Sequence, residues 1–213
     1  MLNKAYFALI AAAMLAAFAA GCGTQTAAQH GQALYETCTP CHGVNGTGNL
    51  ELRVPAIAGL PEWYVKAELT KFKTNVRGAH PDDMEGHRMR PMARSLTGKG
   101  DLEEVAAYVA KMAPVWQKPD FAMADTASGG TMYRNVCVTC HGDDAMGNEA
   151  LGAPPLTNQH DWYLVAQLEK FHSGMRGAHP EDVSGGQMRA MSMTLADSVA
   201  MHDVVSYVKT LSH

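Results

Sequence analysis

The chain has 213 residues, a length that allows one or two compact domains. Hydrophobic residues make up 46% of it and charged residues 18%, a composition that excludes a disordered, highly charged protein. The 17 basic and 21 acidic residues give a formal net charge of −4. No basic excess exists to neutralise a phosphate backbone, so we expect no nucleic-acid partner. The 5 cysteines are too few for a disulfide scaffold, and their odd number leaves one with a separate role.

Residues 1–21 are typical of an export signal. Lys4 supplies the positive start, and residues 5–20 form an uncharged, alanine-rich stretch. This stretch falls short of the ~20 residues needed to span a bilayer. An uncleaved membrane anchor is the alternative, because helix tilt and interfacial residues blur that length limit. We therefore expect the folded part of the chain to lie in the periplasm.

The signal ends in Ala19-Ala20-Gly21-Cys22, which resembles a bacterial lipobox, in which the cysteine becomes the lipidated first residue of the mature protein. Ala19 departs from the leucine that is usual in that motif, so ordinary cleavage near Ala17-Phe18-Ala19 is the second possibility. Lipidation of Cys22 would account for the odd cysteine. It predicts a lipid anchor that holds the protein on a bacterial membrane.

The rest of the chain consists of two copies of one unit. An offset of 99 residues aligns residues 38–112 with 137–211 without a gap, and roughly 28 of the 75 positions are identical. Chance would give only a handful, so the sequence predicts a duplicated domain. We place the first domain at residues 22–113 and the second at 127–213. The segment 114–126 contains prolines and lacks apolar periodicity, which predicts a linker.

Each copy is predicted to be helical. Apolar residues recur at helical spacing over residues 65–76 and 102–112 and over the copies of these segments. Asp101 and Glu104 have the spacing of a capping box at the start of the second segment. No stretch shows sustained strand-like alternation, so the predicted fold class is all-α. Two units of about 90 residues cannot bury much core alone, so a large apolar group should complete each one.

Each copy also carries one Cys-x-x-Cys-His sequence, the attachment signature of c-type haem. The residues are Cys38, Cys41 and His42 in the first copy and Cys137, Cys140 and His141 in the second. Two thiols at this spacing lie on one turn and can add to the two vinyl groups at one porphyrin edge, while the adjacent histidine binds iron. A redox-active or structural Cys-x-x-Cys is the alternative, and a zinc site would need further ligands at close spacing. Because the motif occurs twice in homologous units, we expect two covalently attached haems.

Two prolines follow these motifs at the same distance. Pro55 lies 13 residues after His42, and Pro154 lies 13 residues after His141. A histidine that binds iron needs its Nδ1–H held by an acceptor, which fixes the tautomer and the ring orientation. The carbonyl oxygen of each proline is the candidate acceptor. The alternative is a proline that only shapes a turn.

With these features the chain resembles class I cytochromes c, and among them the dihaem cytochrome c4 type. The resemblance covers residues 29–212 and rests on both Cys-x-x-Cys-His-Gly segments, on Pro55 and Pro154, and on Met89 and Met188. It implies two tandem all-α domains, each wrapped around one covalent haem. It also implies a role in periplasmic electron transfer.

In that family an N-terminal helix crosses the C-terminal helix near the haem edge. The resemblance assigns this contact to Gly31 and Tyr35 in the first unit and to Gly129 and Tyr133 in the second. The spacing from the tyrosine to the first cysteine is one residue longer in the second unit. The two copies therefore do not align without a gap at this point.

The sixth iron ligand separates an electron carrier from an enzyme, because iron with a strong ligand on both faces does not easily bind a substrate. The resemblance assigns this ligand to Met89 and Met188, each 47 residues after the histidine of its motif. Two other retained pairs are alternatives, namely Met92 with Met191 and His80 with His179.

Arg77 and Arg176 also occupy equivalent positions in the two copies. A guanidinium group binds carboxylates in a forked geometry, so these residues are candidate partners of haem propionates. Solvated surface charge is the alternative reading of both.

The resemblance implies a periplasmic or membrane-attached cytochrome that relays single electrons between respiratory redox partners, and it implies no catalytic residue. Such partners are cytochrome complexes, a terminal oxidase or a reductase. The alternative is a dihaem subunit of an oxidoreductase of the peroxidase or thiosulfate-oxidising type. That alternative would usually need one haem with a vacant or unusual distal position, whereas both copies offer methionine.

Overall fold

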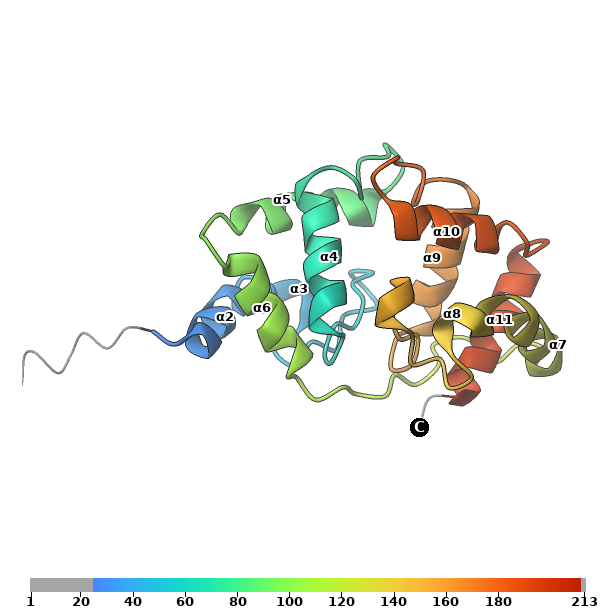
Figure 1. Ribbon diagram of the computed structural model, residues 1–213. Coiled ribbons are helices and arrows are strands. Elements are labelled where there is room, and N and C mark those ends of the chain that lie inside the picture. The colour runs from blue at the N-terminus through green and yellow to red at the C-terminus, as the bar shows by residue number, and fades with distance from the viewer. Residues whose placement is uncertain (1–24, 212–213) are drawn as a thin grey trace, which may run out of the picture.

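The computed structural model describes residues 25–211 and shows two helical units joined by one connector (Figure 1). The first unit contains α2 (Ala27–Tyr35), α3 (Thr39–His42), α4 (Glu62–Lys73), α5 (Met84–Ser95) and α6 (Asp101–Ala110). The second unit repeats that order with α7 (Thr126–Met132), α8 (Val138–His141), α9 (Asp161–His172), α10 (Val183–Ser192) and α11 (Ser198–Leu211). Helix α7 thus begins at the last residue of the predicted linker.

The β structure recorded within residues 25–211 is limited to two isolated bridges, Asn49–Val54 and Asn148–Ala153, which are again equivalent. The all-α prediction is therefore confirmed. In the part of the chain that the structure describes, no helix is both long and apolar enough to cross a membrane. The predicted signal and Cys22 lie outside the described residues.

In each unit the first helix crosses the last helix at a glycine. A Cβ atom on Gly31 of α2 would lie 2.2 Å from the carbonyl oxygen of Glu104 in α6. A Cβ atom on Gly129 of α7 would lie 1.9 Å from the carbonyl oxygen of Asp203 in α11. Such distances are far below van der Waals contact, so the two backbones can approach this closely only where no side chain intervenes. This crossing is the one that the family resemblance implies.

The one-residue difference in spacing is absorbed by a π-helical turn. In the first unit α2 ends at Tyr35, three residues before Cys38, whereas in the second unit Tyr133 lies four residues before Cys137. Residues Tyr133–Cys137 form η1, a π-helix that accommodates one extra residue within the turn. Each tyrosine therefore reaches the same place in its unit.

The capping-box prediction for α6 is wrong. The residue that caps α6 is Gly100, in the left-handed conformation with φ 92°, and Asp101 is already inside the helix. The Asp101 carboxylate instead accepts a hydrogen bond from the backbone N–H of Gly98 at 2.6 Å. A reciprocal capping box is present at the start of α2, between Thr26 and Gln29. The spacing of an acidic pair alone does not show which residue leaves the helical conformation.

Each unit has its own small hydrophobic core, to which the last helix contributes several residues. The buried members in the first unit are Tyr35, Leu96, Val105 and Val109, and those in the second include the equivalent Tyr133, Leu195, Val204 and Val208. Partly buried residues of α4 and α9 pack against these clusters. Cys38 and Cys137 of the two motifs also pack against these clusters.

The connector is tied to the second unit. The carboxylate of Asp161 accepts hydrogen bonds from the backbone N–H groups of Asp120 at 2.8 Å and Phe121 at 3.2 Å. The Ser206 hydroxyl accepts one from the N–H of Ala124 at 2.9 Å. Because Asp161 and Ser206 are fully buried, these contacts fix the path of the connector across the second unit (Figure 1).

Candidate functional site

The two Cys-x-x-Cys-His sequences form the short helices α3 and α8, and a glycine ends each of them. Gly43 has φ 79° and Gly142 has φ 80°, in the left-handed region that other residues rarely adopt. All four thiols are free, and none of them is fully buried. The local fold therefore presents two accessible thiols on each turn, beside the histidine that follows.

The histidines of the two motifs are buried and held in the same way. The Nδ1 atom of His42 lies 3.0 Å from the carbonyl oxygen of Pro55, and that of His141 lies 3.0 Å from the carbonyl oxygen of Pro154. Since a carbonyl only accepts, Nδ1 carries the hydrogen in each ring, and Nε2 keeps its lone pair. Burial lowers the pKa of both imidazoles, which favours this neutral form.

Each motif loop is also held by the tyrosine at the end of the first helix. The Tyr35 hydroxyl donates to the carbonyl oxygen of Gly43 at 2.7 Å, and the Tyr133 hydroxyl donates to that of Gly142 at 2.8 Å. Burial raises the pKa of Tyr35 to about 12, so its hydroxyl stays protonated and remains a donor. The turn that ends each motif is thus anchored from the helix crossing.

One continuous cavity of about 610 Å³ runs between the two motif turns. It is lined by Cys38, Cys41 and His42 from the first unit and by Cys137, Cys140 and His141 from the second. Its walls are mainly apolar and include Leu69, Phe72, Val105, Leu168, Phe171 and Val204. Its volume is in the range of small-molecule and cofactor sites, ~300 to 1,000 Å³.

The polar atoms in this cavity test whether a haem fits. Two buried N–H donors that line it, Trp162 Nε1 and Arg176 Nε, have no hydrogen-bond partner among the described residues. Buried donors normally have partners, so unpaired donors beside an apolar space indicate a ligand with acceptor groups. A haem meets these conditions. Its apolar macrocycle suits the walls of the cavity, its carboxylate substituents can accept from the unpaired donors, and its vinyl groups and iron can bind the two thiols and the imidazole of a motif. The residues present therefore fit a haem.

The methionines proposed as ligands lie on equivalent helices. Met89 on α5 and Met188 on α10 are half-buried and line the cavity. Both helices begin at a buried aspartate whose side chain caps the first turn, Asp83 and Asp182. The alternatives Met92 and Met191 also line the cavity.

Solvent exposure distinguishes the two methionine pairs. Met92 is 43% exposed and Met191 is 42% exposed. Met89 and Met188 are the less exposed pair, and a ligand that closes an apolar cavity should be shielded from water.

The structure does not bring His80 and His179 to the cavity. Both side chains are exposed, and neither lines the space between the motif turns. The Nδ1 atom of each accepts a hydrogen bond from a backbone N–H in its own loop, that of Asp82 and that of Glu181, at 3.2 Å in both cases. These loop contacts occupy the nitrogen nearest the backbone.

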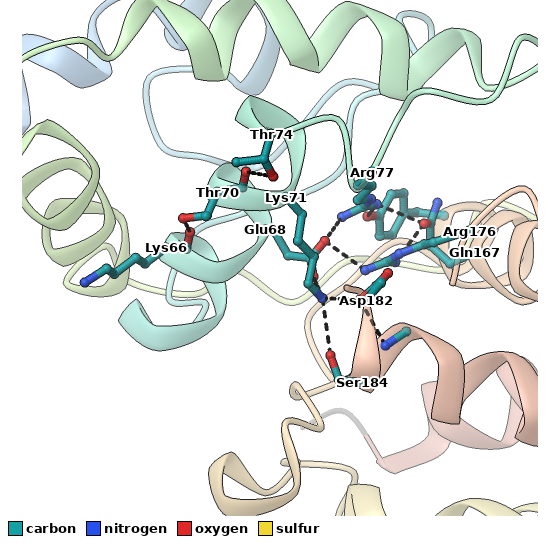
Figure 2. A network of polar contacts seen from close by, with 12 residues as sticks. Lys66, Glu68, Thr70, Lys71, Thr74, Arg77, Gln167, Arg176, Asp182 and Ser184 are labelled. Carbon is teal, nitrogen blue, oxygen red and sulfur yellow. Dashed lines mark hydrogen bonds and ion pairs between the residues drawn. The ribbon is translucent and has the colours of Figure 1, made fainter. Parts of the chain in front are cut away.

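Arg77 and Arg176 are buried where the two units meet, so their reading as solvated surface charge is wrong. Their side chains are 9% and 7% exposed. Figure 2 shows both guanidinium groups beside Glu68 of α4 and Gln167 of α9. Glu68 Oε2 accepts from Arg77 Nη1 at 2.5 Å and from Arg176 Nη2 at 2.9 Å.

Gln167 completes this arrangement from the other unit. Its Oε1 atom accepts from Arg77 Nη2 at 3.0 Å and from Arg176 Nη1 at 2.9 Å. Glu68 and Gln167 are themselves equivalent positions, 99 residues apart. We call these four side chains, Glu68, Arg77, Gln167 and Arg176, the central ring.

Glu68 is ionised within the ring. Burial alone would raise the pKa of its carboxyl group, but the charges of Arg176, Arg77 and Lys71 outweigh that effect and place the pKa far below its ordinary range. The carboxylate therefore keeps its negative charge at any physiological pH.

Two lysines beside the central ring bind across the boundary in equivalent ways. Lys71 Nζ lies 2.8 Å from Asp182 Oδ1, and Lys170 Nζ lies 2.5 Å from Asp83 Oδ1. The same patch of each unit thus contacts its own counterpart, which gives the boundary an approximate twofold symmetry. Each of these aspartates also caps the helix that carries the candidate methionine. The cross-boundary contacts are therefore built into the elements that line the cavity.

Sequence reasoning missed the acidic and amide members of the ring and the two lysines. The signal was available, because Arg77, Lys71 and Asp83 all recur in the second copy. If these side chains only faced solvent, the two copies would not need the same three charged residues at equivalent positions. What the alignment could not show is that these retained charges meet one another.

Comparison with known proteins agrees with this geometry. A family profile described as cytochrome c matches the chain twice, over residues 28–113 and 126–212. A relative from Stutzerimonas stutzeri named thiosulfate dehydrogenase electron acceptor is 33% identical over 176 residues, which cover 76% of each chain.

Two solved structures share the architecture. Reduced recombinant cytochrome c4 from Pseudomonas stutzeri is 27% identical, with a TM-score of 0.63 over 85% of this chain and 97% of its own. A thiosulfate dehydrogenase from Marichromatium purpuratum is 27% identical, with a TM-score of 0.67 over 85% of this chain. This chain spans 40% of that longer protein.

The double family match, the helical units and the equivalent motif turns point to the same class. Cytochrome c domains bind haem covalently, and cytochromes of the c4 type are electron-transfer proteins rather than enzymes. The chain therefore belongs to the cytochrome c family, as a tandem-domain electron-transfer cytochrome of the c4 type.

Proposed function

We propose that the protein carries two covalently attached haems, one in each unit, and relays single electrons between redox proteins. The observation that carries this proposal is the pair of motif turns that open on one continuous cavity, each with its histidine fixed by a proline carbonyl. When bound, haem supplies reversible one-electron chemistry.

The chain's own residues supply attachment and orientation. Cys38 and Cys41 hold one haem through thioether bonds, and Cys137 and Cys140 hold the other. The hydrogen bonds from Nδ1 to Pro55 and Pro154 keep each imidazole in the tautomer whose Nε2 can bind iron. His42 and His141 are the proximal ligands in this proposal.

Met89 and Met188 are the proposed distal ligands. Their support is their place on the cavity wall, their partial burial and their equivalent positions on α5 and α10. Met89 and Met188 would each supply a thioether ligand, and His42 and His141 would each supply an imidazole ligand, so that neither iron would keep a free position for substrate. Histidine–methionine ligation also gives a high reduction potential among haem proteins.

The partners are expected to be other redox proteins, such as cytochrome complexes, a terminal oxidase or a reductase. One relative is named as the electron acceptor of a thiosulfate dehydrogenase, which supports a thiosulfate-oxidising enzyme as one class of donor. The second candidate is a dihaem subunit within an oxidoreductase. The longer thiosulfate dehydrogenase chain, of which this chain spans 40%, favours that candidate over a peroxidase.

The location of the protein is proposed from the sequence before residue 25. The export signal of residues 1–21 supports a periplasmic protein, and Ala20-Gly21-Cys22 supports a lipid anchor at Cys22. More than one acyl chain on that residue would hold the protein on a membrane far more firmly than a single chain.

Haem stoichiometry tests the central proposal. The mature protein, denatured after purification, should keep two haems per chain by intact mass and by its alkaline pyridine spectrum. The C41S variant should lose one thioether bond in the first unit, while the second haem stays bound through both bonds. A single covalent haem in the wild-type chain would contradict the two-haem proposal.

A further inference from the structure

The central ring lies on the wall that the two halves of the cavity share. Its four members come from both units, and all four line the continuous space that also contacts His42 and His141. Glu68 and Arg77 belong to the first unit, and Gln167 and Arg176 occupy the equivalent positions in the second. The charge of the ring therefore borders the same space into which both motif sites open.

The ring is symmetric in its contacts but not in its charge. Glu68 and Gln167 each bridge both guanidinium groups, with distances from 2.5 to 3.0 Å. Only Glu68 is a carboxylate, so one negative and two positive charges give the ring a formal charge of +1. Two carboxylates would make it neutral, and two amides would leave it at +2.

The carboxylate is what holds the two guanidinium groups together. Arg77 and Arg176 would repel each other if no anion lay between them, and both are almost fully removed from water. Four of their N–H groups are directed to Glu68 and Gln167, which fixes both guanidinium planes. Arg176 Nε is left without a partner at the cavity wall, free to donate to a bound group.

Each charge next to the ring has an oppositely charged partner outside it, and Lys71 also contacts Glu68 of the ring. Lys71 contacts Glu68 and Asp182, while Lys170 contacts Asp83 and Glu85. Arg53 contacts Glu85 from the exposed edge of the boundary. The hydroxyl of Tyr163 accepts from Arg77, and Tyr64 lies against the same charges. The ring therefore contributes the unbalanced buried charge of this region among the described residues.

We propose that Glu68 is a positioning residue that serves both haem sites: it holds Arg77 and Arg176 on their shared wall, and its negative charge lowers the reduction potentials of both haems together. This inference rests on the proposed binding of two haems. A fixed negative charge stabilises the ferric form, which carries one more positive charge than the ferrous form. Because Glu68 is buried, water and salt screen this effect only weakly.

Exchanging the acid and the amide tests the proposal. E68Q raises the ring charge to +2, Q167E lowers it to zero, and the double variant E68Q/Q167E restores +1 with the carboxylate in the other unit. Spectroelectrochemical titration gives the two macroscopic midpoint potentials of each variant, whose mean and separation are both informative. The matched control is E103Q, which removes an exposed carboxylate paired with Lys66 at 2.8 Å.

We expect the mean potential to rise in E68Q and to fall in Q167E, while the separation between the two potentials stays at its wild-type value. The double variant and E103Q should retain both wild-type potentials. A shift confined to one of the two potentials, or a changed separation in the double variant, would show that the carboxylate acts within one unit and would overturn the proposal. Unchanged potentials in both single variants would overturn it too.

The pyridine spectrum of each variant is recorded first. If the wild type and the variants all hold fewer than two haems, the proposed two-haem function has failed, and the result does not bear on the role of Glu68. If E68Q does not fold, Q167E and the double variant still decide the outcome, since the proposal predicts a lower mean potential for one and no change for the other.

Discussion

The hydroxyl of Tyr133 donates to the carbonyl of Gly142 just as that of Tyr35 donates to the carbonyl of Gly43, with distances of 2.8 and 2.7 Å. This equality holds although the second tyrosine lies one residue farther from its cysteine motif. The π turn η1 takes up that residue, so the contact at the haem motif is kept while the helix geometry changes. The position of the tyrosine is thus set by the motif that it anchors and not by its distance along the chain.

The glycine crossing that brings these tyrosines into place gives the first prediction. Gly129→Ala should destabilise the protein by about 1 to 3 kcal/mol, because the added Cβ would overlap the carbonyl of Asp203 and force α7 away from α11. Urea unfolding of the haem-loaded protein, followed by its Soret absorbance, measures this cost. Gly186→Ala is the matched control in α10, since the nearest atom to its Cβ lies at 3.7 Å. Equal stability of the two variants would contradict the close crossing.

Acid sensitivity of the boundary between the units gives the second prediction. Burial would raise the pKa of Glu85, but hydrogen bonds from Lys170 and Arg53 lower it to about 2, and the arginines of the central ring lower the pKa of Glu68 as well. Since both carboxyl groups bind protons more weakly in the folded state, the unfolded state takes up more protons as the pH falls. Their contribution to stability is complete above the unfolded pKa of ~4.3 and is lost as the pH falls from there toward 2.

Urea unfolding at pH 7, 4.5 and 3 measures this dependence. E68Q should cost about 3 to 5 kcal/mol at pH 7, because it leaves two buried guanidinium groups without their carboxylate. The loss of stability on acidification should also be smaller in E68Q than in the wild type. E103Q, which removes an exposed pair, should follow the wild-type profile closely. An E68Q profile parallel to the wild type would show that Glu68 does not contribute to this acid sensitivity.

Most of the fold could be predicted from local patterns, and the boundary between the units could not. Helices α4 and α6 could be predicted from the helical spacing of Val65 and Leu69 and of Val105 and Val109. These residues pack in the core of the first unit, so the pattern in the sequence matches the buried face of each helix. The positions of Pro55 and Pro154 follow from one chemical need, an acceptor for the histidine Nδ1–H. Each of these inferences uses residues that are close in sequence or tied to a fixed cofactor geometry.

Glu68 shows what such patterns lack. It lies on α4 beside Leu69, and nothing in its neighbourhood along the chain distinguishes it from a solvated helix residue. Its partner Arg176, which also donates to Gln167, is about a hundred residues away along the chain, and this contact depends on how the two folded units pack. The predicted capping box of α6 was wrong for a related reason. The left-handed conformation of Gly100, which caps the helix instead, depends on the loop before it.

The lipid anchor gives the third prediction. If Cys22 is the lipidated first residue, wild-type protein should fractionate with membranes and carry a lipid mass at its mature N-terminus. Cys22→Ser should lose that mass and move to the soluble fraction, while both haems stay bound, because none of the haem-attaching cysteines is altered. A mature wild-type protein that begins near residue 20 without lipid and is wholly soluble would exclude the anchor and leave only export.

The distal ligands give the fourth prediction. A thioether bound to ferric low-spin haem produces a weak far-red absorption band in this family, and an imidazole in its place does not. Met89→Ala should remove roughly half of that band and open one haem to cyanide or carbon monoxide, and Met188→Ala should do the same for the other. The potential of the affected haem should also fall, because a soft ligand that favours ferrous iron is lost.

The alternative ligands serve as controls for these variants. His80→Ala and His179→Ala should leave the band intact, since both side chains are exposed and lie outside the cavity. Met92→Ala should also keep it, because that side chain is 43% exposed although it lies only one helical turn from Met89. If the histidine variants instead open the iron to cyanide or carbon monoxide while the methionine variants do not, or if the band persists in the double variant of Met89 and Met188, the ligation differs from the proposal. An imidazole on both faces would lower both potentials, and redox partners of lower potential would then have to be sought.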